Sequence, residues 1–245
     1  MRGVVDAARY LTIVPVGGAR ADAPPGASVA WFPVVGLMIG AVLVVVDRLT
    51  AWVFPALLGA LLTVTTWKLL TGGLHLDGLA DCLDALGGHD VVHRLTIMRD
   101  SRIGAFGTIG LILFLLLEIA AVAELASPPR WRVLLVAPAV ARAMPAFLAR
   151  VFQPARSEGQ GARFHADVHP RAVVVAAASA LAAAVVVLGA MGIVAVAVAG
   201  LVGFAVGRFM SARLGGITGD VLGAAVELSE LVVLLTVSAW THAPR

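Results

Sequence analysis

"VVVAAASALAAAVVVLGAMGIVAVAVAG", residues 173–200, decides the fold class of this chain. Two apolar runs lie on either side of "LGAMG", and with their flanks they extend over 171–189 and 191–209. A helix needs about 20 mostly apolar residues to cross a bilayer, so each run fits one crossing. Alanine and glycine are abundant in both, and small side chains let membrane helices approach each other closely. The stretch predicts two packed membrane helices joined by a tight re-entry.

The rest of the 245 residues follows the same pattern. Hydrophobic residues make up 60% of the chain and charged residues only 13%, with a mean hydropathy of +0.97. A soluble domain of this length would need a more polar surface. We therefore predict an all-α, polytopic membrane helix bundle of about seven transmembrane helices, with residues 1–245 forming a single domain. The expected spans are 30–49, 51–70, 105–125, 132–151, 171–189, 191–209 and 222–240.

The distribution of basic residues predicts the orientation. Of 18 lysine and arginine residues, Arg142 lies within an expected span, and only Arg48, Arg130, Arg132 and Arg245 fall on one side of the membrane. The positive-inside rule places the other side in the cytoplasm. The N-terminus and three long polar connections are therefore expected on the cytoplasmic face of the inner (cytoplasmic) membrane. The segments expected there are 1–29, 71–104, 152–170 and 210–221.

One of these connections, "GGLHLDGLADCLDALGG" (72–88), collects carboxylates. Asp77, Asp81 and Asp84 have the spacing i, i+4, i+7, which on a helix gives a narrow stripe. Such a stripe repels itself unless a cation or protons intervene, and carboxylate oxygens suit Mg²⁺. Glycines on both flanks permit the close backbone approach that phosphate sites need. The stretch predicts half of a metal–phosphate site; the alternative is a solvated helix face at the membrane edge.

A second candidate segment is "RLTIMRDSRIGAFGTIG" (94–110). Arg99, Asp100, Ser101 and Arg102 precede Gly104, just before the third expected span. Two arginines around an acid are typical of a phosphate clamp beside a further metal ligand. The alternative is that these are ordinary juxtamembrane arginines, which bind lipid head groups.

The third segment is "RLGGITGDVLGAAVELSE" (213–230). Gly216 belongs to its glycine run, and Asp220 is expected at the cap or first turn of the last span. Glu227 lies on the same face deeper in that span, and an intramembrane carboxylate is a functional candidate by default. Glu118 is a weaker candidate, expected near the outer end of the third span.

Histidines leave alternatives open. His75 lies two residues before Asp77 and is a candidate base or phosphate donor. His89 and His93 have the i, i+4 spacing of a zinc site, but no further soft ligand accompanies them, so a solvated pair is the favoured interpretation. The loop "EGQGARFHADVHP" carries Arg163 between glycines and histidines, where it is a candidate contact for an anionic substrate.

Together the three segments resemble cobalamin synthase, the adenosylcobinamide-GDP ribazoletransferase family. "GGLHLDGLADCLDALGG", "IMRDSRIGAFG" and "LGGITGDVLGAAVELSE" occur in the expected order, and "YLTIVPV", "WFPVVGLMIG" and "EGQGARF" also fit. The likeness covers nearly the whole chain. The departures are mild: Cys82 and Leu83 stand between the acids, and "LDALGG" stands where a glycine often follows the third aspartate.

The resemblance implies a membrane enzyme that requires Mg²⁺ and acts late in vitamin B12 assembly. A hydroxyl of α-ribazole, or of its 5′-phosphate, attacks the phosphorus that carries the corrinoid in adenosylcobinamide-GDP. GMP leaves, and adenosylcobalamin or its 5′-phosphate forms. The reaction is like that of the CDP-alcohol phosphotransferases, a comparison of motif and chemistry only. The expected partners are these two substrates and the lipid bilayer, without nucleic acid.

Roles for the residues follow as hypotheses. Asp84 is the predicted general base, with His75 as its rival and Asp81 beside them as a third catalytic candidate. Arg99 and Arg102 are predicted to hold phosphate oxygens. The predicted metal ligands are Asp77, Asp81, Asp100 and Asp220. The predicted substrate contacts are Arg99, Ser101, Arg102, Gly104, Arg163, Gly216 and Glu227.

Two other functions compete. A lipid-making CDP-alcohol phosphatidyltransferase shares the reaction type, but "LADCLDALGG" lacks the arginine and the spacing of that motif. A transporter with proton- or cation-carrying acids is favoured by Glu227 and Glu230 within a span. Such a transporter predicts acids near the midplane, whereas most acids here lie beside arginines and glycines in the loops.

Overall fold

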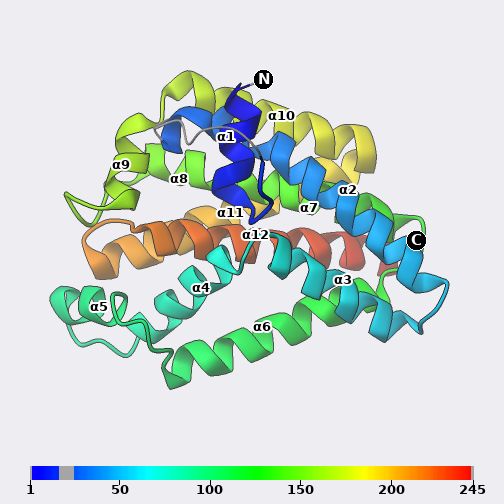
Figure 1. Cartoon of the computed structure of the whole chain (residues 1–245), viewed down its shortest axis with the longest axis horizontal. Coiled ribbons are helices and arrows are strands. Elements are labelled where there is room, and N and C mark those ends of the chain that lie inside the picture. The colour runs from blue at the N-terminus through cyan, green and yellow to red at the C-terminus, as the bar shows by residue number, and fades with distance from the viewer. Residues whose placement is uncertain (1, 17–24, 244–245) are drawn as a thin grey trace.

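The computed structural model describes residues 2–16 and 25–243, and within these ranges it consists of helices without a β-sheet (Figure 1). This confirms the all-α prediction. In chain order the helices are α1 (Arg2–Leu11), the 3₁₀ helix η1 (Pro25–Trp31), α2 (Phe32–Ala51), α3 (Ala56–Leu70), α4 (Leu74–Ala85), α5 (Val91–Ile97), α6 (Ala105–Glu124), α7 (Pro129–Arg142), α8 (Met144–Val151), α9 (Gln160–Asp167), α10 (Pro170–Leu188), α11 (Ala190–Leu214) and α12 (Gly219–His242).

Six helical segments in the described part of the chain are long and apolar enough to cross a membrane. They match six of the seven expected spans to within a few residues. The segments are Gly26–Ala51, Ala105–Glu124, Pro129–Val151, Pro170–Leu188, Ala190–Leu214 and Gly219–His242.

The second expected span, 51–70, differs from the prediction. Its helix α3 begins only at Ala56 and has 15 residues, too few to cross a bilayer alone. After a short break α4 continues at an angle of 91° to it, so the two helices form a bent pair. The break contains Gly72 and Gly73, whose φ angles of 62° and 68° are left-handed and favour glycine. The carboxylate helix α4 therefore lies outside the six spanning helices.

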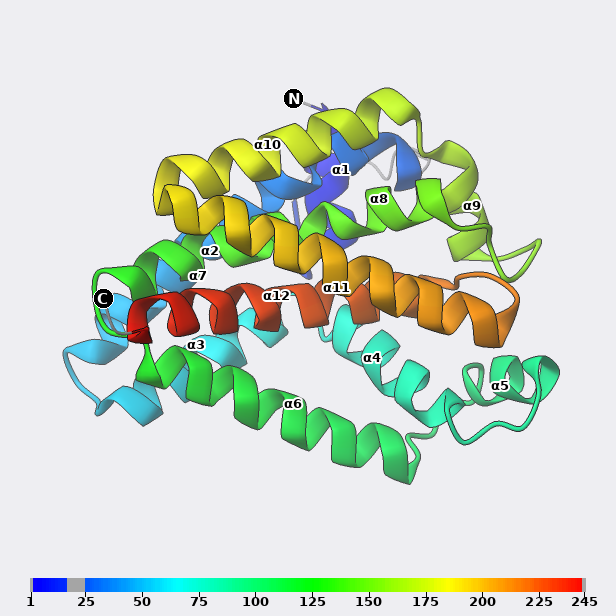
Figure 2. The same cartoon turned by 180° about the vertical axis from the view of Figure 1, so that it is seen from behind.

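Helix α12 occupies the middle of the bundle. In Figures 1 and 2 it runs between a group formed by α3, α4 and α6 and a group that includes α2, α7 and α8. It packs against α4, α6, α7, α8 and α11. Glycines bring it close to α4: a Cβ on Gly78 would lie 2.7 Å from the carbonyl oxygen of Asp220, and one on Gly223 would lie 3.2 Å from the Cα of His75. This contact sets the start of α12 against the carboxylate helix.

The small residues of 173–200 act as predicted. Helices α10 and α11 pack against each other, and a side chain at Gly192 would collide with the backbone of Ala184. Gly36 and Gly40 do the same for α2, where a Cβ would meet the backbone of α7. Close approach through glycine and alanine thus supports the bundle on its outer side as well as at its centre.

Candidate active site

A large open cavity of about 890 Å³ lies beside α4 and the first turn of α12. The end of α1, the α3–α4 break and the loop before α6 complete its walls. Four aspartates from three segments reach it, together with the predicted arginines. Its lining residues are Tyr10, Thr12, Ile13, Thr71, Gly72, Gly73, Leu74, Asp77, Ala80, Asp81, Met98, Arg99, Asp100, Ser101, Arg102, Ile103, Leu111 and Asp220.

Asp77, Asp81 and Asp220 form the acidic side of this cavity. The predicted helix stripe is confirmed, since Asp77 and Asp81 lie one turn apart on α4. Asp220 joins them because Gly78 lets the first turn of α12 approach. Partial burial, and then the charges of Asp220, Asp77 and Asp84, raise the pKa of Asp81 to about 7, while Arg156 opposes the rise. Crowded carboxylates that disfavour one another's charge are the donor set a hard divalent cation would relieve.

Asp84 has a different environment. One of its carboxylate oxygens accepts a hydrogen bond from the backbone N–H of Gly104 at 2.7 Å, and the other accepts one from Gly107 at 2.8 Å. Both N–H groups belong to the start of α6, so Asp84 ties α4 to that helix. Its carboxylate fills the space that a side chain at Gly104 or Gly107 would need. Asp84 does not line the large cavity.

The loop before α6 forms the basic side of the cavity. Arg99, Ser101 and Arg102 all line it, as the sequence indicates for a phosphate clamp. Asp100 also lines it, but its carboxylate is bound by the guanidinium of Arg102, with Nη2 2.6 Å and Nε 3.0 Å from its oxygens. The hydrogen bonds from Arg102 lower the pKa of Asp100 to about 2. Asp100 is therefore paired already, unlike the three aspartates opposite.

Arg156 belongs to the same neighbourhood, although the sequence analysis did not select it. Residues 153–155 and 217 pair through their backbones, from Ala155 N–H to Ile217 at 2.8 Å and back to Gln153 at 2.9 Å. Arg156 follows this pairing, and its Nε is buried without a hydrogen-bond partner. Desolvation and the charge of Arg99 lower the pKa of Arg156, whereas Asp220 and Asp81 oppose that shift.

The remaining candidates lie around the large cavity rather than in it. His75 is buried on α4 and faces a smaller neighbouring cavity. Gly216 packs against the backbone of 153–155, where a Cβ would lie 2.6 Å from the nitrogen of Ala155. Arg163 lines a separate surface hollow with Glu158. His89 and His93 are near each other, with 2.7 Å between their Nδ1 atoms, and His89 pairs with Asp90 on the surface.

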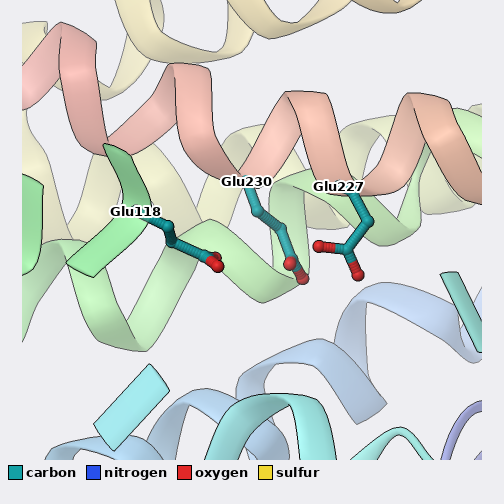
Figure 3. A group of neighbouring side chains, drawn as sticks. All are labelled: Glu118, Glu227 and Glu230. Carbon is teal, nitrogen blue, oxygen red and sulfur yellow. The ribbon is translucent and has the colours of Figure 1, made fainter. Parts of the chain in front are cut away.

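Glu227 belongs to a buried ion cluster instead of the cavity. Figure 3 shows Glu118, Glu227 and Glu230 pointing toward a common space between α6 and α12. The ammonium of Lys68 lies among them, 2.9, 2.6 and 3.1 Å from their respective oxygens. Arg142 pairs with Glu230. Glu118, the weaker candidate in the sequence, is fully buried in this cluster.

The charged side chains of this cluster are shielded from the surface of the protein. The side chains of Glu118, Glu227, Glu230 and Arg142 are at most 1% exposed. The three carboxylate oxygens could enclose a metal ion, but the Lys68 ammonium already occupies that position. We interpret the cluster as the polar core that joins α3, α6, α7 and α12, since buried charges need partners.

These features define a class: an integral membrane helix bundle with a cavity that opposes carboxylates to arginines, suited to a phosphate ester with a divalent cation. The cobalamin-5-phosphate synthase family model matches residues 3–238. The adenosylcobinamide-GDP ribazoletransferase of Geotalea daltonii is 37% identical over 236 residues, 95% of each chain. That of Roseiflexus sp. is 36% identical over 237 residues, 95% of this chain and 88% of its own.

The relative of the same name from Escherichia coli O17:K52:H18 is 41% identical over 209 residues, which is 83% of this chain and 84% of its own. The chain thus belongs to the cobalamin-5-phosphate synthase family. No solved structure gives a significant match.

Proposed function

We propose that this protein is an adenosylcobinamide-GDP ribazoletransferase that acts at the large cavity. It transfers the adenosylcobinamide phosphate moiety to α-ribazole or its 5′-phosphate and releases GMP. The family and its named relatives support the reaction. The observation that carries the location is the convergence of Asp77, Asp81 and Asp220 on a cavity whose other side holds Arg99 and Arg102.

The cavity residues divide into two functions. Asp77 and Asp220, with one oxygen of Asp81, would hold Mg²⁺, for which crowded carboxylate oxygens are suitable ligands. When bound, the metal neutralises charge on the diphosphate and on the leaving GMP. Arg99 and Arg102 hold phosphate oxygens from the other side, and Arg156 adds a third cation near Asp81 and Asp220.

The geometry also distinguishes among the candidate bases. Of Asp81, Asp84 and His75, only Asp81 lines the large cavity. We therefore assign Asp81 the proton of the attacking ribose hydroxyl, because a general base must reach that proton. Asp84 becomes a positioning residue: its two hydrogen bonds fix the start of α6 and hence the loop that carries Arg99 and Arg102.

Cellular placement is part of the proposal. We propose that the cavity lies on the cytoplasmic face of the inner membrane, and the arginines of the neighbouring loops support this orientation. Both substrates are large, polar and made from nucleotides, so a cavity on that face meets them without transport. The ion cluster does not favour the transporter alternative, because its acids are already engaged in ion pairs with Lys68 and Arg142.

The test is product formation by the purified protein in detergent. It receives adenosylcobinamide-GDP and α-ribazole with Mg²⁺, or with EDTA, and both GMP and the corrinoid product are measured. We expect magnesium-dependent GMP release in equal amount to a cobalamin product. Asp77→Asn and Asp220→Asn should each lose more than about 99% of turnover, on the order of the effect of removing a metal ligand.

Asp90→Asn is the matched control. Asp90 caps α5 by accepting from the N–H of His93, away from the cavity, and its substitution makes the same chemical change. It should retain turnover. Turnover that persists in EDTA, or in Asp77→Asn, would overturn the metal assignment. Absence of product from folded wild-type protein would overturn the reaction, and CDP-activated alcohols would then be tried as substrates.

A further inference from the structure

A second cavity adjoins the carboxylate site. It has a volume of about 120 Å³ and shares Tyr10, Leu74, Asp77 and Asp220 with the large one. The ring of Tyr10 and the first turn of α12 thus lie between the two spaces. The small cavity lies within the bundle, between α1, α2, α4, α9 and the start of α12. It is far too small for a corrin.

Aromatic and aliphatic side chains form part of the walls of the small cavity. Tyr10, Phe32 and Phe164 come from three different helices and lie against one another, with ring centroids 5.7, 6.0 and 6.1 Å apart. Tyr10 is nearly parallel to the other two rings, at 17° and 15°. Leu11 and Leu222 add apolar surface. Parallel aromatic rings beside a cavity offer a stacking surface for a flat ligand.

Besides the residues that it shares with the large cavity, the small cavity is lined by one further polar side chain, His75. His75 is 5% exposed, and its Nδ1 is buried without a hydrogen-bond partner. Buried polar atoms are normally satisfied, so an orphan beside a cavity calls for a ligand or a water. The imidazole ring carries nitrogens that can donate or accept a hydrogen bond to such a ligand.

We propose that the small cavity binds the flat base of the acceptor nucleoside, with His75 donating a hydrogen bond to its free ring nitrogen. The inference rests on the proposed function, because α-ribazole is a benzimidazole nucleoside. Its base offers two methyl groups and a single free acceptor nitrogen. The aromatic and leucine side chains of the cavity suit the methyl groups, and His75 offers a donor for the nitrogen.

The other flat group in the reaction is the guanine of the donor. Guanine has several donors and acceptors around its edge, and each one left buried without a partner would cost about 1–3 kcal/mol. The small cavity offers Asp77 and Asp220 as possible partners for guanine, so the variants below distinguish the two bases. The residues that line both cavities favour binding of the benzimidazole base in the small one. With its base in the small cavity, the ribose of the acceptor lies beside Asp77 and Asp220, where its hydroxyl meets the carboxylate site.

A cavity-filling variant tests the proposal. Gly219 lines the small cavity, and a Cβ there would meet no atom within 4 Å. Gly219→Val should raise the KM for α-ribazole about tenfold or more and leave the KM for adenosylcobinamide-GDP unchanged. Gly200→Val is the matched control, since a Cβ on that α11 glycine also meets nothing within 4 Å and lies away from both cavities. Its two KM values should equal those of the wild type.

A second pair of variants tests the hydrogen bond. His75→Leu removes the donor and should weaken equilibrium binding of α-ribazole in the absence of the corrinoid, whereas His75→Gln keeps an N–H and should restore part of it. If wild type forms cobalamin but Gly219→Val leaves the KM for α-ribazole unchanged, the base binds elsewhere. A raised KM for the donor alone would assign the cavity to guanine and overturn the proposal. If Gly219→Val does not fold, the His75 pair decides.

A failure of the proposed function has a different signature from a failure of this inference. The first appears as absence of cobalamin from wild-type protein, whatever the variants do. The second appears as active wild type with variants whose α-ribazole KM and binding do not change.

Discussion

Asp84 illustrates how a carboxylate of the predicted stripe can be held by backbone N–H groups instead of lining the cavity. Its spacing from Asp77 and Asp81 placed it in the same stripe, and the helix prediction was confirmed. The sequence could not show that both of its oxygens are occupied by the N–H groups of Gly104 and Gly107, which lie 20 and 23 residues away. That bonding depends on how α6 packs against α4.

Asp84→Ala should therefore act through structure. Loss of the acceptor for two N–H groups at a helix start costs about 1–2 kcal/mol, so the unfolding temperature in detergent should fall. The turnover number should also fall because the Arg99–Arg102 loop loses its anchor, while the pKa values in the pH–rate profile stay unchanged. Asp90→Ala, which removes the cap of α5, is the control and should leave turnover intact. If Asp84→Ala instead loses one limb of the pH–rate profile while its unfolding temperature is unchanged, Asp84 is the general base.

Glu227 illustrates the opposite case. An acid within a span was a reasonable functional candidate, but its partner, Lys68, lies 159 residues earlier in the chain. Long-range pairing of this kind leaves no local pattern in the sequence. Arg156 escaped selection for the same reason, although its place just before the glycine-rich segment 157–161 was an available signal.

Lys68→Met should destabilise the protein strongly. With all groups ionised, the cluster holds three carboxylates and two cations, and the substitution leaves three carboxylates with one cation. Removing one partner from a buried ion pair costs about 3–5 kcal/mol. Lys68→Met with Glu227→Gln restores the original net charge and should recover part of the loss in a thermal unfolding measurement. Arg48→Met, at an exposed cation, is the control; equal stability of Lys68→Met and wild type would refute the argument.

At the scale of elements, hydropathy located six candidate spans well, because the suitability of a segment for lipid depends on the mean hydropathy of about 20 consecutive residues. It could not locate the bend between α3 and α4, which depends on two backbone angles. The dipeptide Gly72-Gly73 was the available signal, since consecutive glycines often mark a turn. The bend directs α4, with its aspartates, toward the start of α12.

Gly73→Ala tests the importance of that bend. A Cβ would meet no atom there, so the whole effect comes from the φ angle of 68°, which costs an L residue about 1–2 kcal/mol. We expect a lower unfolding temperature and reduced turnover. Gly87→Ala, at the other end of α4, has ordinary van der Waals contacts and no positive φ, so it should match wild type. Equal behaviour of the two variants would show that the left-handed turn is dispensable.

At the scale of the whole molecule, the orientation predicted from the arginines stays a prediction. Cys82 is the only cysteine and is buried, so Cys82→Ala provides a background for single-cysteine labelling. Val92→Cys, on exposed α5, should react with a membrane-impermeant maleimide in inside-out vesicles. Ala126→Cys, between α6 and α7, should react in right-side-out vesicles. The reverse pattern would place the cavity outside the cell and contradict the proposed location.

The buried ion cluster has a consequence for how the protein is made. Its cations come from α3 and α7, but two of its three acids come from α12, which is synthesised after the other described helices. Until then Lys68 and Arg142 have only Glu118 as a partner, and an unpaired charge within a bilayer costs about 2.5–3.5 kcal/mol on insertion scales. A chain that ends before α12 therefore retains unneutralised charge among its helices. The same helix brings Asp220 to the candidate active site, so a chain without α12 lacks both the ion pairs of the cluster and one side of that site.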